Sequence, residues 1–175
     1  MNESVIIEFM KILLPAAAVL YAMYLTVKSF LNKEVAERMA DLKVKGVEAT
    51  LPIRLQAYER LSLLLERIAP NNLILRLNDS SYSAKELQHV LTTSVREEYN
   101  HNLSQQIYVG DQAWQLTTQA VEDIIATVNQ AADTLPSEAR SLDLAKKILE
   151  IQSQKEVYPI TQALYEVKKE VRELF

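Results

Sequence analysis

A long apolar run opens the chain, and shorter apolar stripes at helical spacing follow it. No residue from Ile12 to Val27 carries a charge. A helix that starts at Val5 and ends at Val27 is about 34 Å long, enough to cross a hydrocarbon core of about 30 Å. The sequence therefore predicts a transmembrane anchor over residues 1–28. The side chains assigned to the membrane anchor are Ile12, Leu13, Leu14, Pro15, Val19, Leu20 and Leu25.

Two other interpretations of this run stay open, a cleaved signal peptide and a buried or interfacial helix. A signal peptide begins with positive residues, whereas Glu3 and Glu8 lie at the start of this run and Lys11 comes late. The apolar stretch also continues into an amphipathic segment and not into a small-residue cleavage site. A retained anchor is therefore favoured, and the small pair Ala18 and Ala22 suggests a close helix contact within the membrane.

Basic side chains gather on the carboxyl side of the predicted anchor. They are Lys28, Lys33, Arg38, Lys43 and Lys45. On the amino side stands Lys11 alone. Because basic flanks stay in the cytoplasm, the amino terminus is expected outside and the carboxyl part inside. The predicted localisation is the bacterial inner (cytoplasmic) membrane, with a single pass.

Residues 29–48 continue the helical pattern with a narrow apolar stripe and form a predicted linker or stalk helix. The stripe consists of Leu31, Val35, Met39 and Leu42. Glu34 and Arg38 are spaced as an i, i+4 ion pair. Such a stripe fits a packed linker helix or a coiled-coil stalk, and the first interpretation is favoured.

Residues 49–175 repeat apolar positions at helical spacing and predict a cytoplasmic bundle of about five helices, an all-α fold. The expected helices cover residues 50–69, 83–103, 111–135, 141–154 and 159–175. A bend is expected near residues 100–104, because apolar steps of four drift around a helix of 3.6 residues per turn.

Local signals set the expected helix boundaries. Thr50 is expected to cap the first bundle helix, and Ser83 with Glu86 to form a capping box. Asp111, which follows Gly110, is a good N-cap. Residues 73–77 are expected to be extended or a single helical turn.

Composition agrees with this architecture and removes several function classes. The chain has two glycines and no cysteine, and its net charge is −4. Helix formers dominate, as an all-α protein requires. Disulfides, thiolate catalysis and cysteine-ligated zinc are excluded, and the charge gives no indication of nucleic-acid binding.

The spacing Glu98-x-x-His101 resembles the ligand pairs of di-iron bundles, and Glu86-x-x-His89 repeats it. In those bundles the pairs lie on different helices. Here both lie on one predicted helix, about 18 Å apart, so they cannot share a metal within one chain. We therefore predict no catalytic residue, metal ligand or cofactor. A metal-dependent enzyme using Glu98 and His101 is kept as a disfavoured alternative.

Several polar and aromatic residues follow Glu98 in the sequence. They are His101, Asn102, Gln105, Gln106, Tyr108 and Trp114. Short polar groups at a helix break satisfy freed backbone groups, and the aromatics bring apolar area with one donor each. We interpret the stretch as a helix corner, with a partner-binding surface as the alternative. The arginines Arg54, Arg60 and Arg67, beside Glu59 and Glu66, are interpreted as a salt-bridged solvent face.

Four stretches of the sequence resemble a known family. They are "LPIRLQAYERLSLLLERIAPNNLILRL", "HNLSQQIYV", the segment around Trp114 and "LDLAKKILE". They resemble a family of small, uncharacterised bacterial proteins found mainly in Bacteroidota, and the likeness covers essentially the whole chain. The resemblance implies an N-terminal hydrophobic anchor with a helical cytoplasmic part, and it supplies no activity and no site residues.

The expected function is that of a non-enzymatic, membrane-anchored scaffold or accessory subunit of a membrane protein complex. Its expected partners are the lipid bilayer and one or more proteins, with a homo-oligomer left open. No nucleic acid and no small-molecule substrate are expected. The alternative within the same class is a self-associating stalk or membrane organiser.

Overall fold

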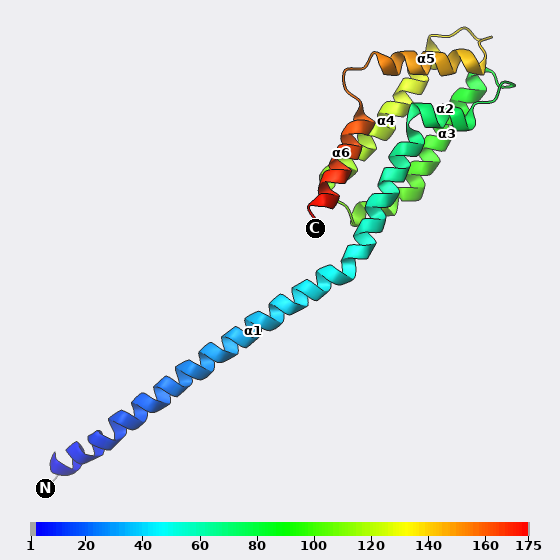
Figure 1. Cartoon of the computed structure of the whole chain (residues 1–175). Helices are drawn as coiled ribbons and strands as arrows, with labels where there is room; N and C mark the ends of the chain where they lie inside the picture. The colour runs from blue at the N-terminus through cyan, green and yellow to red at the C-terminus, as the bar shows by residue number, and fades with distance from the viewer. Residues whose placement is uncertain (1–2, 175) are drawn as a thin grey trace. The chain divides into compact units, whose positions relative to one another are not determined.

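The computed structural model describes residues 3–174, and within them the chain is all-helical, as predicted (Figure 1). Residues 1–2 and 175, at the ends of the predicted anchor and bundle, lie outside the described residues. The chain divides into two compact units, one ending at Thr50 and one beginning at Leu51. Helix α1, Glu3–Ile68, contributes to both units.

In the first unit α1 is long and apolar enough to cross a membrane, and none of its most apolar stretch is buried within the protein. Pro15 lies inside the helix without ending it. The predicted ion pair between Arg38 and Glu34 is present, with Nη2 and Oε1 2.6 Å apart. Apolar side chains in this unit are therefore uncovered by the chain itself.

The helix boundary expected at Thr50 is wrong, because α1 continues through Thr50 and Pro52. The Thr50 hydroxyl donates to the Gly46 carbonyl oxygen at 3.0 Å. This backward bond is typical of a threonine inside a helix, whereas an N-cap side chain accepts from N–H groups ahead of it.

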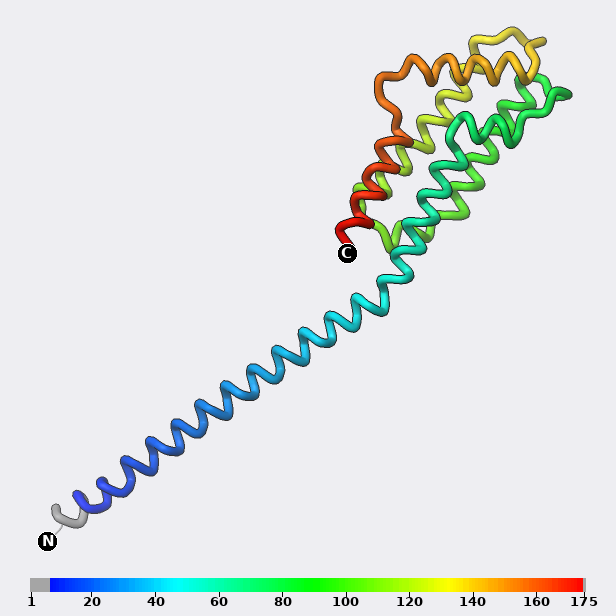
Figure 2. The backbone as a smooth tube through the Cα atoms, in the orientation of Figure 1, coloured from blue at the N-terminus to red at the C-terminus, as the bar shows by residue number. Residues whose placement is uncertain are grey.

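The second unit is a helical bundle built from the end of α1 and the elements that follow. These are α2 (Pro70–Leu77), α3 (Ala84–Asn102), the 3₁₀ helix η1 (Leu103–Ile107), α4 (Asp111–Asp133), α5 (Ser141–Ser153) and α6 (Pro159–Arg172). Helix α4 packs against α3, α5 and α6, as the tube in Figure 2 shows. The core contains fully buried side chains from several helices, among them Leu61, Leu64, Leu87, Ile124, Leu144 and Ile148.

Most boundary signals of the bundle act as expected. Ser83 and Glu86 form the capping box, with Ser83 N donating to Glu86 Oε2 at 2.8 Å and Glu86 N donating to Ser83 Oγ at 3.3 Å. The break near residues 100–104 is present, since α3 ends at Asn102 and η1 follows. Pro159 begins α6.

The structure decides one open choice in the bundle and corrects one expectation, the N-cap at Asp111. Residues 73–77 belong to helix α2, in which Leu73 and Ile74 are buried. Asp111 is the first residue of α4, and the N-cap is Gly110. An aspartate in the first turn still stabilises a helix, because its charge opposes the positive end of the helix dipole.

Candidate functional site

The predicted anchor residues are all exposed in the first unit, from 46% for Leu25 to 74% for Ile12. Ala18 and Ala22 are exposed as well. The Thr26 hydroxyl donates to the Ala22 carbonyl oxygen at 2.9 Å, so this polar group is satisfied inside its own helix. Burying one large apolar side chain is worth about 1.5–3 kcal/mol, so this uninterrupted surface has a strong tendency to be covered.

In the second unit, the sequence-predicted corner residues run from the end of α3, through η1, to the first turn of α4. Asn102 is buried and its amide donates to the Glu98 carbonyl oxygen at 2.8 Å. Gln105 is buried as well, whereas His101 and Gln106 are exposed. The group is therefore divided, with two amides holding the corner and two polar side chains facing solvent.

Aromatic residues on both sides of this corner connect it to neighbouring helices. Trp114, half-buried at the start of α4, stacks on Tyr99 of α3 with ring centroids 5.6 Å apart. The Tyr99 hydroxyl is hydrogen-bonded to the Thr118 hydroxyl at 3.1 Å. Tyr108 is 40% exposed, and its carbonyl oxygen accepts from Arg54 Nε at 3.1 Å. The corner is thus tied both to α3 and to the bundle part of α1.

A cluster around Glu170 of α6 joins this corner to two other helices. Glu170 Oε2 accepts from the Tyr58 hydroxyl at 2.8 Å and from Gly110 N at 2.9 Å. Arg54 Nη2 donates to the Tyr58 hydroxyl at 3.2 Å. We call Arg54, Tyr58, Gly110 and Glu170 the Glu170 cluster. It connects residues from α1, the loop before α4, and α6 through one carboxylate.

Space, and not backbone conformation, explains the glycine in this cluster. Gly110 has φ −70° and ψ 152°, values that any residue adopts. A Cβ added there would lie 2.7 Å from Glu170 Cδ and would overlap the carboxylate. The missing side chain lets the carboxylate approach the backbone N–H.

The electrostatics of the cluster follow from burial. Tyr58 is 2% exposed, and its removal from water, followed by its hydrogen bond to Glu170, raises the pKa of its phenol. Arg54 acts in the opposite direction. The phenol therefore stays protonated and acts as a donor, which suits a structural junction.

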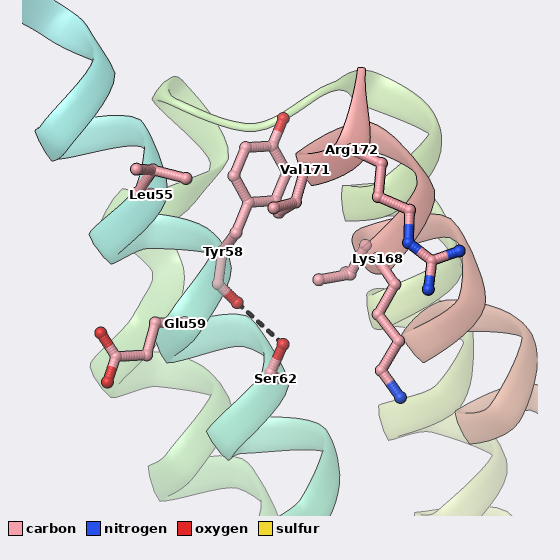
Figure 3. A pocket seen from close by; sticks show the side chains of 8 residues that line it. Leu55, Tyr58, Glu59, Ser62, Lys168, Val171 and Arg172 are labelled. Carbon is pink, nitrogen blue, oxygen red and sulfur yellow. Dashed lines mark hydrogen bonds between the residues drawn. The ribbon is translucent and has the colours of Figure 1, made fainter. Parts of the chain in front are cut away.

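A groove of about 340 Å³ lies beside this cluster, between the bundle part of α1 and α6. Its lining residues are Leu55, Tyr58, Glu59, Ser62, Val167, Lys168, Val171 and Arg172. Figure 3 shows Tyr58 and Val171 directed toward one another across the groove, while Glu59 points away from Lys168 and Arg172. The Ser62 hydroxyl donates to the Tyr58 carbonyl oxygen at 3.0 Å and so is not poised as a nucleophile. The groove is a mostly apolar surface with a basic side.

A second, polar cleft of about 360 Å³ contains the Glu98 and His101 pair. Arg67 Nε donates to Glu98 Oε2 at 2.8 Å, so a cation already occupies this carboxylate. The other such glutamate, Glu86, is engaged in its capping box. Among residues 3–174, no group of three or more His, Asp or Glu side chains is placed to hold a metal ion.

Two of the α1 arginines form contacts beyond their own helix. Arg67 pairs with Glu98 of α3 and not with Glu66. Arg54 donates to Tyr58 and to the Tyr108 carbonyl oxygen, and not to Glu59. Arg60, Arg67, Glu59 and Glu66 are exposed, which agrees with a solvent face. Arg54 is half-buried and instead ties α1 to the loop before α4.

Comparison with known proteins places the chain in a family. The model of the family described as "Family of unknown function (DUF7935)" matches residues 4–174. The chain belongs to this family. No curated protein and no solved structure matches the chain.

DUF7935 membership covers both structural units, since the match runs from the apolar part of α1 to the end of the bundle. The family model therefore includes both the uncovered apolar helix and the bundle. In this DUF7935 protein, sequence reasoning missed the Glu170 cluster. Tyr58 and Glu170 are separated by 112 positions, so no spacing rule connects them.

Proposed function

We propose that the protein is a non-enzymatic, membrane-anchored scaffold or accessory subunit, with its helical bundle on the cytoplasmic face. The exposed apolar stretch of α1 carries the proposal. Its side chains stay between 46% and 74% exposed from Ile12 to Leu25 wherever they are large and aliphatic. Lipid is the cover that matches an uncharged stretch of this length.

The orientation rests on charge. Lys28 and Lys33 follow the uncharged stretch directly, and Lys43 and Lys45 lie further along the same helix. The Lys28 ammonium lies 5.8 Å from the centroid of the Tyr24 ring, an arrangement suited to a membrane boundary. This asymmetry favours a cytoplasmic bundle.

A binding role for the bundle is supported by how its polar groups are used. The Glu170 cluster and the Arg67–Glu98 pair hold helices together. Glu98, the strongest acid-base candidate of the sequence, is occupied by this pair. The surfaces of the bundle that are available to a partner are the groove beside α6 and the polar cleft beside α3.

The anchor is tested by a charge placed at the middle of the stretch. Leu20→Arg should cost roughly 2.5–3.5 kcal/mol of insertion free energy. It should shift the protein toward the fraction released by alkaline carbonate. The matched control is Leu75→Arg, at a leucine that is 84% exposed in α2, and it should stay membrane-bound. A wild-type protein found in the soluble fraction would refute the anchor.

Topology and partner binding need separate measurements. Protease added to intact cells should leave a carboxyl-terminal tag intact, and intact mass should show the apolar stretch retained. Affinity purification from several mild detergents should recover a complex. Recovery of nothing but the monomer in all of them would contradict the scaffold role.

A further inference from the structure

A heptad seam lies on α1 between the apolar stretch and the bundle. It consists of Val35, Met39, Leu42, Gly46 and Ala49, whose spacing is 4, 3, 4 and 3. This is the spacing of the a and d positions of a coiled coil. Val35, Met39 and Leu42 are 54%, 63% and 69% exposed, and Gly46 has nothing within 4 Å of an added Cβ. The first unit therefore leaves the seam uncovered.

Basic residues border the seam on both sides. With Val35 and Leu42 at d, Arg38 and Lys45 fall at g, and Lys43 falls at e. The acidic residues of this segment fall at c and f, on the opposite side of the helix, and they are Glu34, Glu37, Asp41 and Glu48. The surface that a partner helix would meet is therefore apolar with basic edges.

Ion pairs within the helix leave most of this basic edge available. Arg38 is paired with Glu34 at 2.6 Å, and Lys33, which lies away from the seam, is paired with Glu37 at 3.8 Å. Among the described residues of the first unit, no ion pair engages Lys43 or Lys45. Lys43 and Lys45, on opposite edges of the seam, are therefore the side chains best placed to form ion pairs with an acidic partner.

We infer that this seam binds an amphipathic helix of another protein, one whose apolar stripe is bordered by Glu or Asp. The inference rests on the proposed function and names the kind of partner it requires. Glu or Asp at the partner's e and g positions would meet Lys43 and Lys45 across the seam. Gly46 and Ala49 have small or no side chains, which lets a partner backbone approach closely at that end.

A second copy of this chain fits the same surface poorly. In a parallel pair a g residue faces an e residue of the partner, which sets Arg38 against Lys43. In an antiparallel pair g faces g and e faces e, which again sets basic residues together. Like charges at these positions select against self-pairing.

An anionic membrane surface is also a poorer occupant. The seam is about 80° wide on a helical projection, whereas an interfacial helix buries a broad apolar face. The residues of the seam also belong to the same uninterrupted helix as the anchor stretch. A narrow seam with charges at its edges is the geometry of helix-to-helix packing.

The test uses a photo-crosslinking amino acid in the full chain, in cells. It is placed at Leu42, in the seam, and as a matched control at Val44, which is 55% exposed on the opposite face. Position 42 should give a protein adduct whose crosslinked segment is a helix with acidic edges, and position 44 should not. An adduct with a second copy, or with lipid alone, would overturn the inference.

Charge reversal then tests the edges with a defined probe. Two synthetic helices of about four heptads, with Leu at a and d and either Glu or Lys at e and g, are titrated against the full chain in neutral phosphatidylcholine nanodiscs. The Glu helix should bind at least about tenfold more tightly, and Lys43→Glu/Lys45→Glu should invert this preference. Equal affinities for both helices would overturn the inference.

The two proposals fail in different ways. A partner retained in detergent by the unmodified chain, with no protein adduct at position 42, overturns the inference about the seam and leaves the scaffold role standing. A chain recovered as a monomer throughout overturns the scaffold role and the inference together.

Discussion

The Glu170 cluster makes Gly110→Ala a sharp test of how the bundle is held together. The new methyl group would overlap the Glu170 carboxylate. Since this carboxylate ends a flexible side chain, it can swing away, but it then leaves the Tyr58 hydroxyl and Gly110 N, which it now accepts from at 2.8 and 2.9 Å. The cost of the substitution is therefore the loss of two hydrogen bonds and not a steric wall.

The magnitude follows from two opposing terms. A hydrogen bond to a charged group is worth about 1.5–3 kcal/mol, and the two bonds here share one acceptor, so their joint loss costs about 3 kcal/mol. Replacing glycine at an ordinary φ of −70° recovers about 0.4–1 kcal/mol by restricting the unfolded chain. The net expectation is a loss of about 2 kcal/mol of unfolding free energy.

Trp114 provides the readout. It is the one tryptophan of the chain, and it stacks on Tyr99 within the bundle. Urea titration of the full chain in nanodiscs, followed by tryptophan fluorescence, should show the midpoint for Gly110→Ala lowered by about 1 M. Gly46→Ala is the matched control, because a Cβ there meets nothing within 4 Å, and it should not lower the midpoint.

A double-mutant cycle decides whether the carboxylate is the cause. In a Glu170→Ala background the overlap and both bonds are already absent, so Gly110→Ala should lose most of its destabilising effect. What then remains is the small difference between the poorer N-cap and the restricted unfolded chain, two effects that oppose each other. An equal loss in both backgrounds would refute the reasoning. The reasoning would also be refuted if Gly110→Ala in the wild-type background caused no loss of unfolding free energy.

Two further parts of the bundle give predictions of known sign. Lys155 Nζ contacts both carboxylate oxygens of Asp123, at 2.6 and 2.7 Å. Lys155→Met and Asp123→Asn should each lower the unfolding free energy by about 1–2 kcal/mol, with the double variant losing less than the sum in urea titrations. Ser83→Ala should lose about 1 kcal/mol at neutral pH in the same titration, because it removes an N-cap. Hydrogen bonds from the backbone and then the hydroxyl of Ser83 lower the pKa of Glu86 below its ordinary 4.5. This carboxylate therefore adds stability above pH 4.5 that is lost as the pH falls through the lowered pKa. The midpoint of wild type should thus fall more steeply with acid than that of Glu86→Gln.

Helix existence and class could be predicted because the signals are local. Ser83 and Glu86 lie three residues apart, and Pro159 sets its own backbone angle, so each acts without help from distant residues. The sequence leaves residues 73–77 open between an extended segment and a helical turn, because a short apolar run fits both equally well. What decides between them is the burial of Leu73 and Ile74 against the core, a tertiary effect.

The error at Thr50 has a different origin. A threonine hydroxyl serves equally as an N-cap acceptor and as a donor to the preceding turn, so the residue type alone does not distinguish a helix start from a helix interior. Gly46, four residues earlier, weakens a helix without ending it. The bond from Thr50 to the Gly46 carbonyl settles the choice for a continuous α1.

For the Glu170 cluster, the sequence held one ambiguous sign, the isolated Gly110. A glycine before an aspartate reads as a loop signal, and its real function depends on a carboxylate 60 positions away. The cluster therefore belongs to the part of a fold that is determined only when distant helices meet.

Uncovered apolar surface is distributed unevenly between the two units, and this asymmetry is the main support for the proposed function. In the bundle, exposed large apolar residues such as Leu63, Leu75 and Tyr165 come from different helices, while the core side chains are fully buried. In the first unit they follow one another from Ile7 to Val47 without a covering element. Folding alone gives no reason for a chain to keep such a surface, because its burial is worth about 1.5–3 kcal/mol per large side chain. The uncharged part of that surface matches lipid, and the part bordered by Lys43 and Lys45 matches an acidic helix. In the proposed function, the bundle is the element that these two contacts hold at the membrane.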